Sequence, residues 1–125
     1  MYMCILCYVY LSIATPGRLD MPELTSVTDS SVKVSYKTPE NIDNSKRIEY
    51  MVNYRKGGDN EWQSTLVTSR MSQIVTGLDK NSLYEVTVAA RYKGGYWGKE
   101  SHPIAIRTLK SAIGECCLVY ALLKL

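Results

Sequence analysis

The residues of this 125-residue sequence that could take part in catalysis form no motif that supports it. The one histidine, His102, directly precedes Pro103, where an ordinary surface residue is the simplest interpretation. The sequence contains neither a Gly-x-Ser-x-Gly nucleophile elbow nor a phosphate-binding glycine loop. Acidic neighbours such as Asp59 and Glu61 lie in a turn-rich stretch and need only solvent. We therefore expect a protein that is not an enzyme and that uses no cofactor.

The four cysteines all lie near the ends of the chain, at Cys4, Cys7, Cys116 and Cys117. Four cysteine thiolates can bind zinc. The first pair, however, lacks the glycine or polar neighbours usual in such sites, and adjacent cysteines point apart. We expect no metal site and favour unpaired thiols, with a disulfide between the two ends as the alternative.

The best candidate for binding is the stretch that reads Lys-Gly-Gly-Tyr-Trp-Gly-Lys. Tyr96 and Trp97 are residue types typical of interface anchors, and Lys93 and Lys99 flank them. Two interpretations stay open at this point. Either the loop binds a protein partner, or Trp97 folds back over the edge of the sandwich and stacks beneath Arg91 or Lys93.

The composition excludes several classes of protein. Apolar residues make up 46% and charged residues 22% of the chain, and the net charge is +3. These values are close to those of ordinary globular domains and exclude a disordered tail, a collagen-like repeat and a multi-pass membrane protein. Because the basic residues do not cluster, no nucleic-acid partner is expected.

The interval between the apolar ends has the alternation of apolar and polar residues that is typical of β-strands. The three clearest runs are Ser31–Lys37, Ile48–Arg55 and Tyr84–Ala90, and the four weaker ones are Pro22–Thr28, Glu61–Thr68, Met71–Thr76 and Pro103–Leu109. Turn residues separate them, and no window has the periodicity of a long helix. The pattern predicts an all-β, seven-stranded antiparallel β-sandwich.

The same interval resembles a fibronectin type III domain, an immunoglobulin-like fold. The resemblance follows the order of the family's strands: Pro22 with Leu24 and Val27, then Val32 to Tyr36 with Pro39, Ile48 to Tyr54, Trp62, Gly77-Leu78 with Tyr84, and Gly98, Ser101 and Pro103. A true immunoglobulin domain would carry a cysteine pair between its sheets. Since this interval has no cysteine, we reject that alternative.

Four residues are expected to have structural roles in such a domain. Leu78 and Tyr84 flank a connection that must arch between sheets, so Tyr84 is expected to bury its ring and bond its hydroxyl to upstream backbone, the tyrosine corner. Trp62 matches an aromatic position of the family. Tyr36 stands where the family usually has a core Trp, and its hydroxyl needs a partner if buried.

We expect the domain to cover residues 20–110, with apolar segments at 1–19 and 111–125 outside it. Tyr2 to Ala14 is apolar enough for a signal-peptide core, although no Lys or Arg precedes it. A short membrane anchor or the arbitrary end of a fragment are the alternatives. A membrane association is expected only through such a terminal segment.

The resemblance implies a protein-binding and spacer module of an extracellular adhesion or cell-surface receptor protein, next to further type III or Ig-like domains. The alternative is a purely architectural module of a larger intracellular or enzyme-bearing protein, so a cytoplasmic location stays open. A cytokine-receptor domain is a third interpretation, because Trp97 to Ser101 loosely resembles the Trp-Ser-x-Trp-Ser box of those receptors.

Overall fold

A computed structural model describes residues 15–40 and 42–111 of the chain. The described part consists of seven strands and contains no helix. The strands are β1 (Glu23–Thr25), β2 (Val32–Ser35), β3 (Ile48–Lys56), β4 (Gln63–Ser64), β5 (Ser72–Val75), β6 (Leu83–Tyr92) and β7 (Ile104–Arg107). The terminal segments that carry the four cysteines and the expected signal peptide lie outside the described residues.

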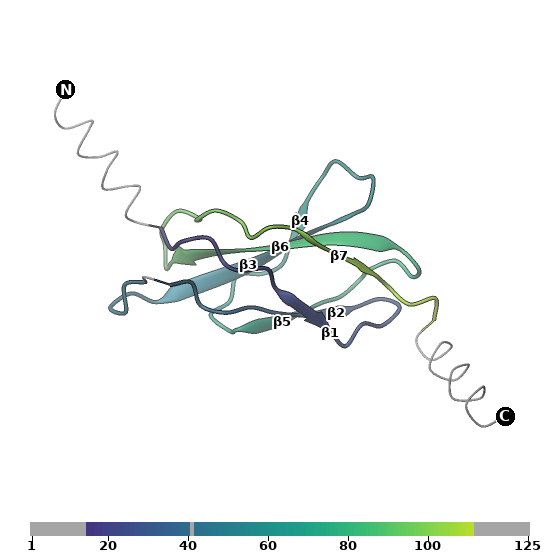
Figure 1. The fold of residues 1–125 in the computed structure, drawn as a ribbon, viewed down its shortest axis with the longest axis horizontal. Helices are drawn as coiled ribbons and strands as arrows, with labels where there is room; N and C mark the ends of the chain where they lie inside the picture. Colours follow the sequence, from purple (N-terminus) through teal and green to yellow (C-terminus); the bar gives the residue numbers. More distant parts are fainter. Residues whose placement is uncertain (1–14, 41, 112–125) are drawn as a thin grey trace.

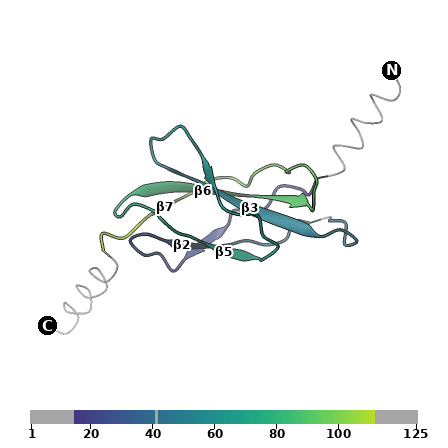
Figure 2. The same cartoon turned by 180° about the vertical axis from the view of Figure 1, so that it is seen from behind.

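The strands form two antiparallel sheets that face each other (Figure 1). One sheet has the order β1-β2-β5, and the other has the order β4-β3-β6-β7. The view from behind shows β2 and β5 together in the first layer and β3 and β6 in the second (Figure 2). The prediction of an all-β, seven-stranded antiparallel sandwich is therefore confirmed.

The alternating residues of β2, β3 and β6 fill the space between the sheets, as their pattern predicted. The buried cluster comprises Leu19, Val32, Val34, Tyr36, Tyr50, Val52, Val75, Leu78, Tyr84, Val86, Val88 and Ala90. At its centre Val52 of β3 lies directly opposite Val88 of β6 in the longest ladder of the molecule. Burial of these aliphatic and aromatic side chains is the main stabilising contribution to the fold.

Tyr36 occupies the core position at which the family usually has tryptophan. Its ring packs against that of Tyr50, with centroids 4.8 Å apart and planes tilted by 43°. Its hydroxyl donates a hydrogen bond of 2.6 Å to the carbonyl of Arg70, and the Gln73 side chain approaches it at 3.4 Å. Burial raises the pKa of this phenol, so it stays protonated as a donor.

The weaker sequence patterns correspond to shorter strands than expected. Glu61–Thr68 was predicted as one strand, but only Gln63–Ser64 forms β4. The chain then follows β3 through isolated backbone contacts. The Thr65 amide donates to the Val52 carbonyl, and Thr68 forms an isolated antiparallel β-bridge with Tyr50. Intermittent pairing of this kind leaves no regular alternation for a sequence pattern to show.

The sandwich begins earlier than the expected boundary at residue 20. Leu19 is 2% exposed and belongs to the core cluster. Residues just before it lie close to the segment after β6, since the carbonyl of Pro16 is next to the α-carbon of Gly98. The part of the chain that the structure describes includes no helix long and apolar enough to cross a membrane.

Candidate functional site

The candidate loop begins with a tight turn at the end of β6. The Gly95 amide donates to the Tyr92 carbonyl at 2.7 Å, and Gly94 has a φ of +75°, which glycine adopts without strain. The amide of Lys93 donates to the carbonyl of Arg47 at 2.9 Å, so this turn is fixed to the segment that precedes β3. The loop therefore starts from a well-anchored base.

Within the loop, Tyr96 and Trp97 have different environments. The Tyr96 side chain is 69% exposed. Trp97 is partly buried, and its ring lies on the guanidinium of Arg91, 4.6 Å from the ring centroid. Arg91 in turn pairs with Glu49 of β3 at 3.2 Å. The geometry favours the packing interpretation for Trp97 and leaves Tyr96 as the exposed aromatic of the loop.

After Trp97 the chain runs along the edge of β6, on the side where β7 pairs further along. The Gly98 amide donates to the Ala90 carbonyl at 2.9 Å, and the Ser101 amide donates to the Val88 carbonyl at 2.8 Å. The Val88 amide returns a bond of 2.9 Å to the hydroxyl of Ser101, which is buried. These bonds fix the loop residues between them on the surface of the domain.

Exposed cations surround Tyr96 in the sequence and at this end of the sandwich. Lys93, Lys99 and Arg47 are all exposed. Lys46 is exposed too, and its ammonium lies 5.2 Å from the centroid of the Tyr92 ring. An exposed aromatic among cations is suited to a partner surface that offers carboxylates.

An acidic side chain lies next to these cations. The hydroxyl and amide of Ser45 donate to the carboxylate of Asp43 at 2.6 and 3.0 Å. These bonds, with the charge of Lys46, hold the pKa of the Asp43 carboxyl below its ordinary value. Asp43 therefore stays ionised and limits how positive this end of the domain is.

A second Trp-Arg-Glu stack lies at the other end of the same sheet face. The guanidinium of Arg55 lies 4.5 Å from the centroid of the Trp62 ring and pairs with Glu85 at 3.3 Å. Trp62, expected to be structural, thus lies on the outer face, 38% exposed, just before β4. The two ion pairs are placed symmetrically in the ladder of β3 and β6. Arg55 lies opposite Glu85, three residues to one side of the Val52–Val88 pair, and Glu49 lies opposite Arg91, three residues to the other side.

Polar side chains cover the space between the two stacks. The Asn53 amide donates to the Glu100 carboxylate at 2.8 Å, and its carbonyl accepts from the Ser64 hydroxyl at 2.6 Å. Thr87 and Ala89 of β6 are buried on this outer side as well. No sequence pattern indicates this cover, because residues far apart in the chain supply it.

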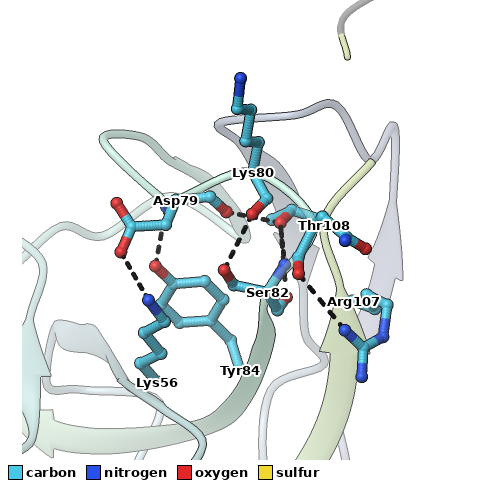
Figure 3. Close-up of polar contacts among 8 residues, drawn as sticks. Lys56, Asp79, Lys80, Ser82, Tyr84, Arg107 and Thr108 are labelled. Atoms are coloured by element: carbon cyan, nitrogen blue, oxygen red, sulfur yellow. Dashed lines mark hydrogen bonds and ion pairs between the residues drawn. The ribbon is translucent and has the colours of Figure 1, made fainter. Parts of the chain in front are cut away.

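The expected tyrosine corner, drawn in Figure 3, lies at the start of β6, at the end of that strand opposite the candidate loop. Tyr84 is buried beside Leu78, and its hydroxyl accepts a 2.8 Å hydrogen bond from the Asp79 amide, five residues upstream. Asp79 also pairs with Lys56 at 2.9 Å, which raises the pKa of that lysine. The geometry makes Tyr84 a support of the arch.

The arch has a second support that was not predicted, the buried Thr108 (Figure 3). Its hydroxyl donates to the Asp79 carbonyl at 2.5 Å and accepts from the Ser82 amide at 3.0 Å. The Asn81 amide donates to the Leu109 carbonyl at 2.8 Å. A lone threonine after a strand gives no sequence signal for such a role.

Among the described residues, those considered for chemistry do not form a metal site. His102 is exposed, and its Nε2 lies 3.2 Å from a guanidinium nitrogen of Arg18. Within residues 15–40 and 42–111, no three His, Cys, Asp or Glu side chains lie close enough to hold a metal ion.

Comparison with known proteins agrees with this geometry. The sequence model of the family described as "Fibronectin type III domain" matches residues 16–107. This chain belongs to the fibronectin type III family. Such domains are typically non-enzymatic structural and binding modules, and they commonly lie beside other type III or Ig domains.

Solved structures of type III domains superpose on this one. The FN5 domain of Drosophila Lar is 28% identical with a TM-score of 0.61, over 75% of this chain and 97% of that domain. A human fibronectin type III domain containing protein 3 domain is 16% identical with a TM-score of 0.69, over 80% and 91%. A titin fragment is 22% identical with a TM-score of 0.67, but this chain spans only 32% of it.

Proposed function

We propose that this type III domain is a non-enzymatic protein-binding and spacer module of an extracellular adhesion or cell-surface receptor protein. It binds its partner through the end of the sandwich that carries Tyr96. The observation that carries this proposal is the contrast inside the loop. Trp97 is held on Arg91 as a rigid base, while the Tyr96 ring next to it is 69% exposed. Because the backbone on either side of Tyr96 is hydrogen-bonded at Gly95 and Gly98, the loop loses little backbone entropy on binding.

The charges near Tyr96 support a partner with acidic residues on its surface. Lys93, Lys99 and Arg47 contribute exposed cations, and the nearby Asp43 leaves the balance positive. Such rim charges act mainly on the rate of association and on its salt dependence. The domain therefore offers one aromatic anchor inside a basic rim.

The binding experiment uses the purified full chain, fluorescently labelled, on a panel of intact adherent cells. Saturable binding is expected on at least one cell type, and Tyr96→Ala is expected to weaken it by about tenfold, the size of an interface anchor. Leu83→Ala, an exposed apolar residue at the opposite end of β6, is the matched control and should bind like the parent. Equal binding of the Tyr96 variant and the control would reject the site.

The extracellular context has a separate experiment. Expression of the chain in secretory cells is expected to release protein into the medium with its N-terminus cleaved near Ala14. Recovery of the uncleaved chain from the cytosol would contradict the location and favour the architectural alternative. The Tyr96 experiment uses purified protein, so its outcome does not depend on the result of this expression experiment.

A further inference from the structure

The free edge of the three-stranded sheet, strand β5, has properties that the Tyr96 end does not explain. β5 is the last strand in the order β1-β2-β5, so β2 is its one neighbour among the described strands. The Tyr36 amide donates to the Met71 carbonyl, and Val34 opposes Gln73 in the same register. Because hydrogen-bonded and non-bonded pairs alternate in antiparallel ladders, the amides and carbonyls of the intervening residues point away from β2.

Those intervening residues are Ser72 and Ile74. Their backbone groups face the side of the sandwich on which no described strand is paired to β5. The other edge strands are better protected. β4 has two residues, β1 has three and follows Pro22, and β7 follows Pro103. Proline and short length are common means of blocking edge pairing, so β5 is the least protected edge.

A groove of about 520 Å³ runs beside this edge. Its apolar walls come from two side chains on different segments, Ile74, which is 64% exposed, and Leu66, which is 89% exposed. Such exposed aliphatic side chains are unusual next to open backbone groups, because together they form a template for another strand.

The charges of the groove are of one sign. Lys33, which lies opposite Ile74 on β2, and Arg70, which precedes β5, both line it, and no Asp or Glu does. The carboxylate on this side of the sheet, Glu23, belongs to β1, two strands from the edge. The position of Arg70 is fixed, since its carbonyl accepts from Tyr36 and its amide donates to Thr68.

We propose that β5 is a docking edge for an extended segment of a partner protein that carries aliphatic residues and Asp or Glu on the same face, two residues apart, because Ile74 and Lys33 lie on one face of the sheet. The segment adds as a further strand: its backbone pairs with Ser72 and Ile74, its aliphatic side chains cover Ile74 and Leu66, and its carboxylates meet Lys33 and Arg70. This is strand addition, in which main-chain bonds give affinity and side-chain pockets give selectivity. A second copy of the chain fits poorly, because two-fold pairing of β5 would bring like charges together.

The proposal is tested by mRNA display, in which random 12-residue peptides are selected for binding to the full chain. Selected peptides are expected to place aliphatic and acidic residues two positions apart, so that both lie on one face of the added strand. They are expected to bind the Lys33→Glu/Arg70→Glu variant at least about tenfold more weakly, as for loss of close charge pairs. The matched control Lys80→Glu/Lys110→Glu has the same change of net charge at exposed lysines elsewhere and should keep full affinity.

Backbone pairing is tested by amide hydrogen exchange of the parent chain. Addition of a selected peptide is expected to slow the exchange of the Ser72 and Ile74 amides. Ile74→Pro, which removes one outward amide, is expected to abolish binding, and its thermal unfolding reports whether the fold persists. If that variant does not fold, the exchange result on the parent chain decides.

Three outcomes would overturn the proposal. One is that no selected peptide prefers the parent chain over the charge-reversed variant. The second is that the peptides protect amides elsewhere, for instance around Tyr96. The third is that Ser72 and Ile74 become protected without peptide as the chain concentration rises, which would make a second copy the occupant.

Discussion

The two sheets of the sandwich differ in what covers their outer faces. On the four-stranded sheet, Trp97 and Trp62 lie on arginines at either end, and Asn53 with its partners covers the space between them. On the three-stranded sheet, Lys33 and Ile74 stand open to solvent. The same core side chains lie between both sheets, so the difference arises from the outer residues and the irregular segments that reach them.

This difference indicates that the outer faces of the two sheets have separate roles. A partner that used the outer face of β3 and β6 would first have to displace the domain's own side chains, at the cost of their contacts. The outer face and edge of β5 need no such displacement. The cover on the larger sheet therefore adds to the stabilisation that the core provides on its other face, while the bare face of the smaller sheet is available for interactions.

The largest expected effect is at the point where the covering segment meets the N-terminal residues. In Gly98→Ala the new methyl group would collide with the Pro16 carbonyl and crowd the Ala90 carbonyl at 3.3 Å. Both are backbone atoms, so relief requires the segment to shift, and we expect unfolding free energy to fall by about 3 kcal/mol. Urea unfolding measures it. Gly17→Ala, with open space around it, is the control, and equal stability of the two variants would contradict the close contact.

An intermediate effect should distinguish the two Trp-Arg-Glu stacks. Arg91→Ala removes a more enclosed ion pair and the support of a partly buried Trp97, so we expect a loss of about 1–2 kcal/mol. Arg55→Ala removes a more exposed pair and should cost about half as much. Chemical unfolding followed by tryptophan fluorescence compares them, and a reversed order would show that burial does not rank the stacks.

The smallest expected effect is a gain in stability on the covered face. The Thr87 hydroxyl is buried and has no hydrogen-bond partner within the described part of the chain. Thr87→Val keeps the shape and removes the desolvated hydroxyl, so unfolding free energy should rise by about 1 kcal/mol. Thr25→Val on the bare sheet should change it by less than about 0.5 kcal/mol. Differential scanning calorimetry measures both, and destabilisation by the Thr87 change would mean that the hydroxyl is bonded.

Residues that alternate on regular strands made most of the fold predictable. Val32, Val34, Tyr50, Val52 and Val88 each face the core at the place that the period of two requires. Tyr84 was predictable for a different reason, since the arch before it demands a buried ring with a polar end. Local pattern and local chemistry agree at these positions, and there the sequence alone is sufficient.

The outer faces were less predictable, because their partners come from distant and irregular parts of the chain. Trp97 had two open interpretations in the sequence, and only its distance to Arg91 separates them. Nothing in the spacing of Asn53, Ser64 and Glu100 brings them together. The open edge of β5 was equally hidden, since strand order is a property of the folded sheet and does not follow from the pattern of one strand.

The two ends of the described chain leave the sandwich on opposite sides (Figure 1). When such a domain is pulled through its ends, tension runs along the strands, and the hydrogen bonds of β1 to β2 and of β7 to β6 are sheared together rather than opened one at a time. Thr108, directly after β7, bonds to the arch at the C-terminal end of the sandwich, where the pulling force acts. In a chain of similar domains, this one would carry mechanical load in series, leaving its lateral β5 edge free of the line of force.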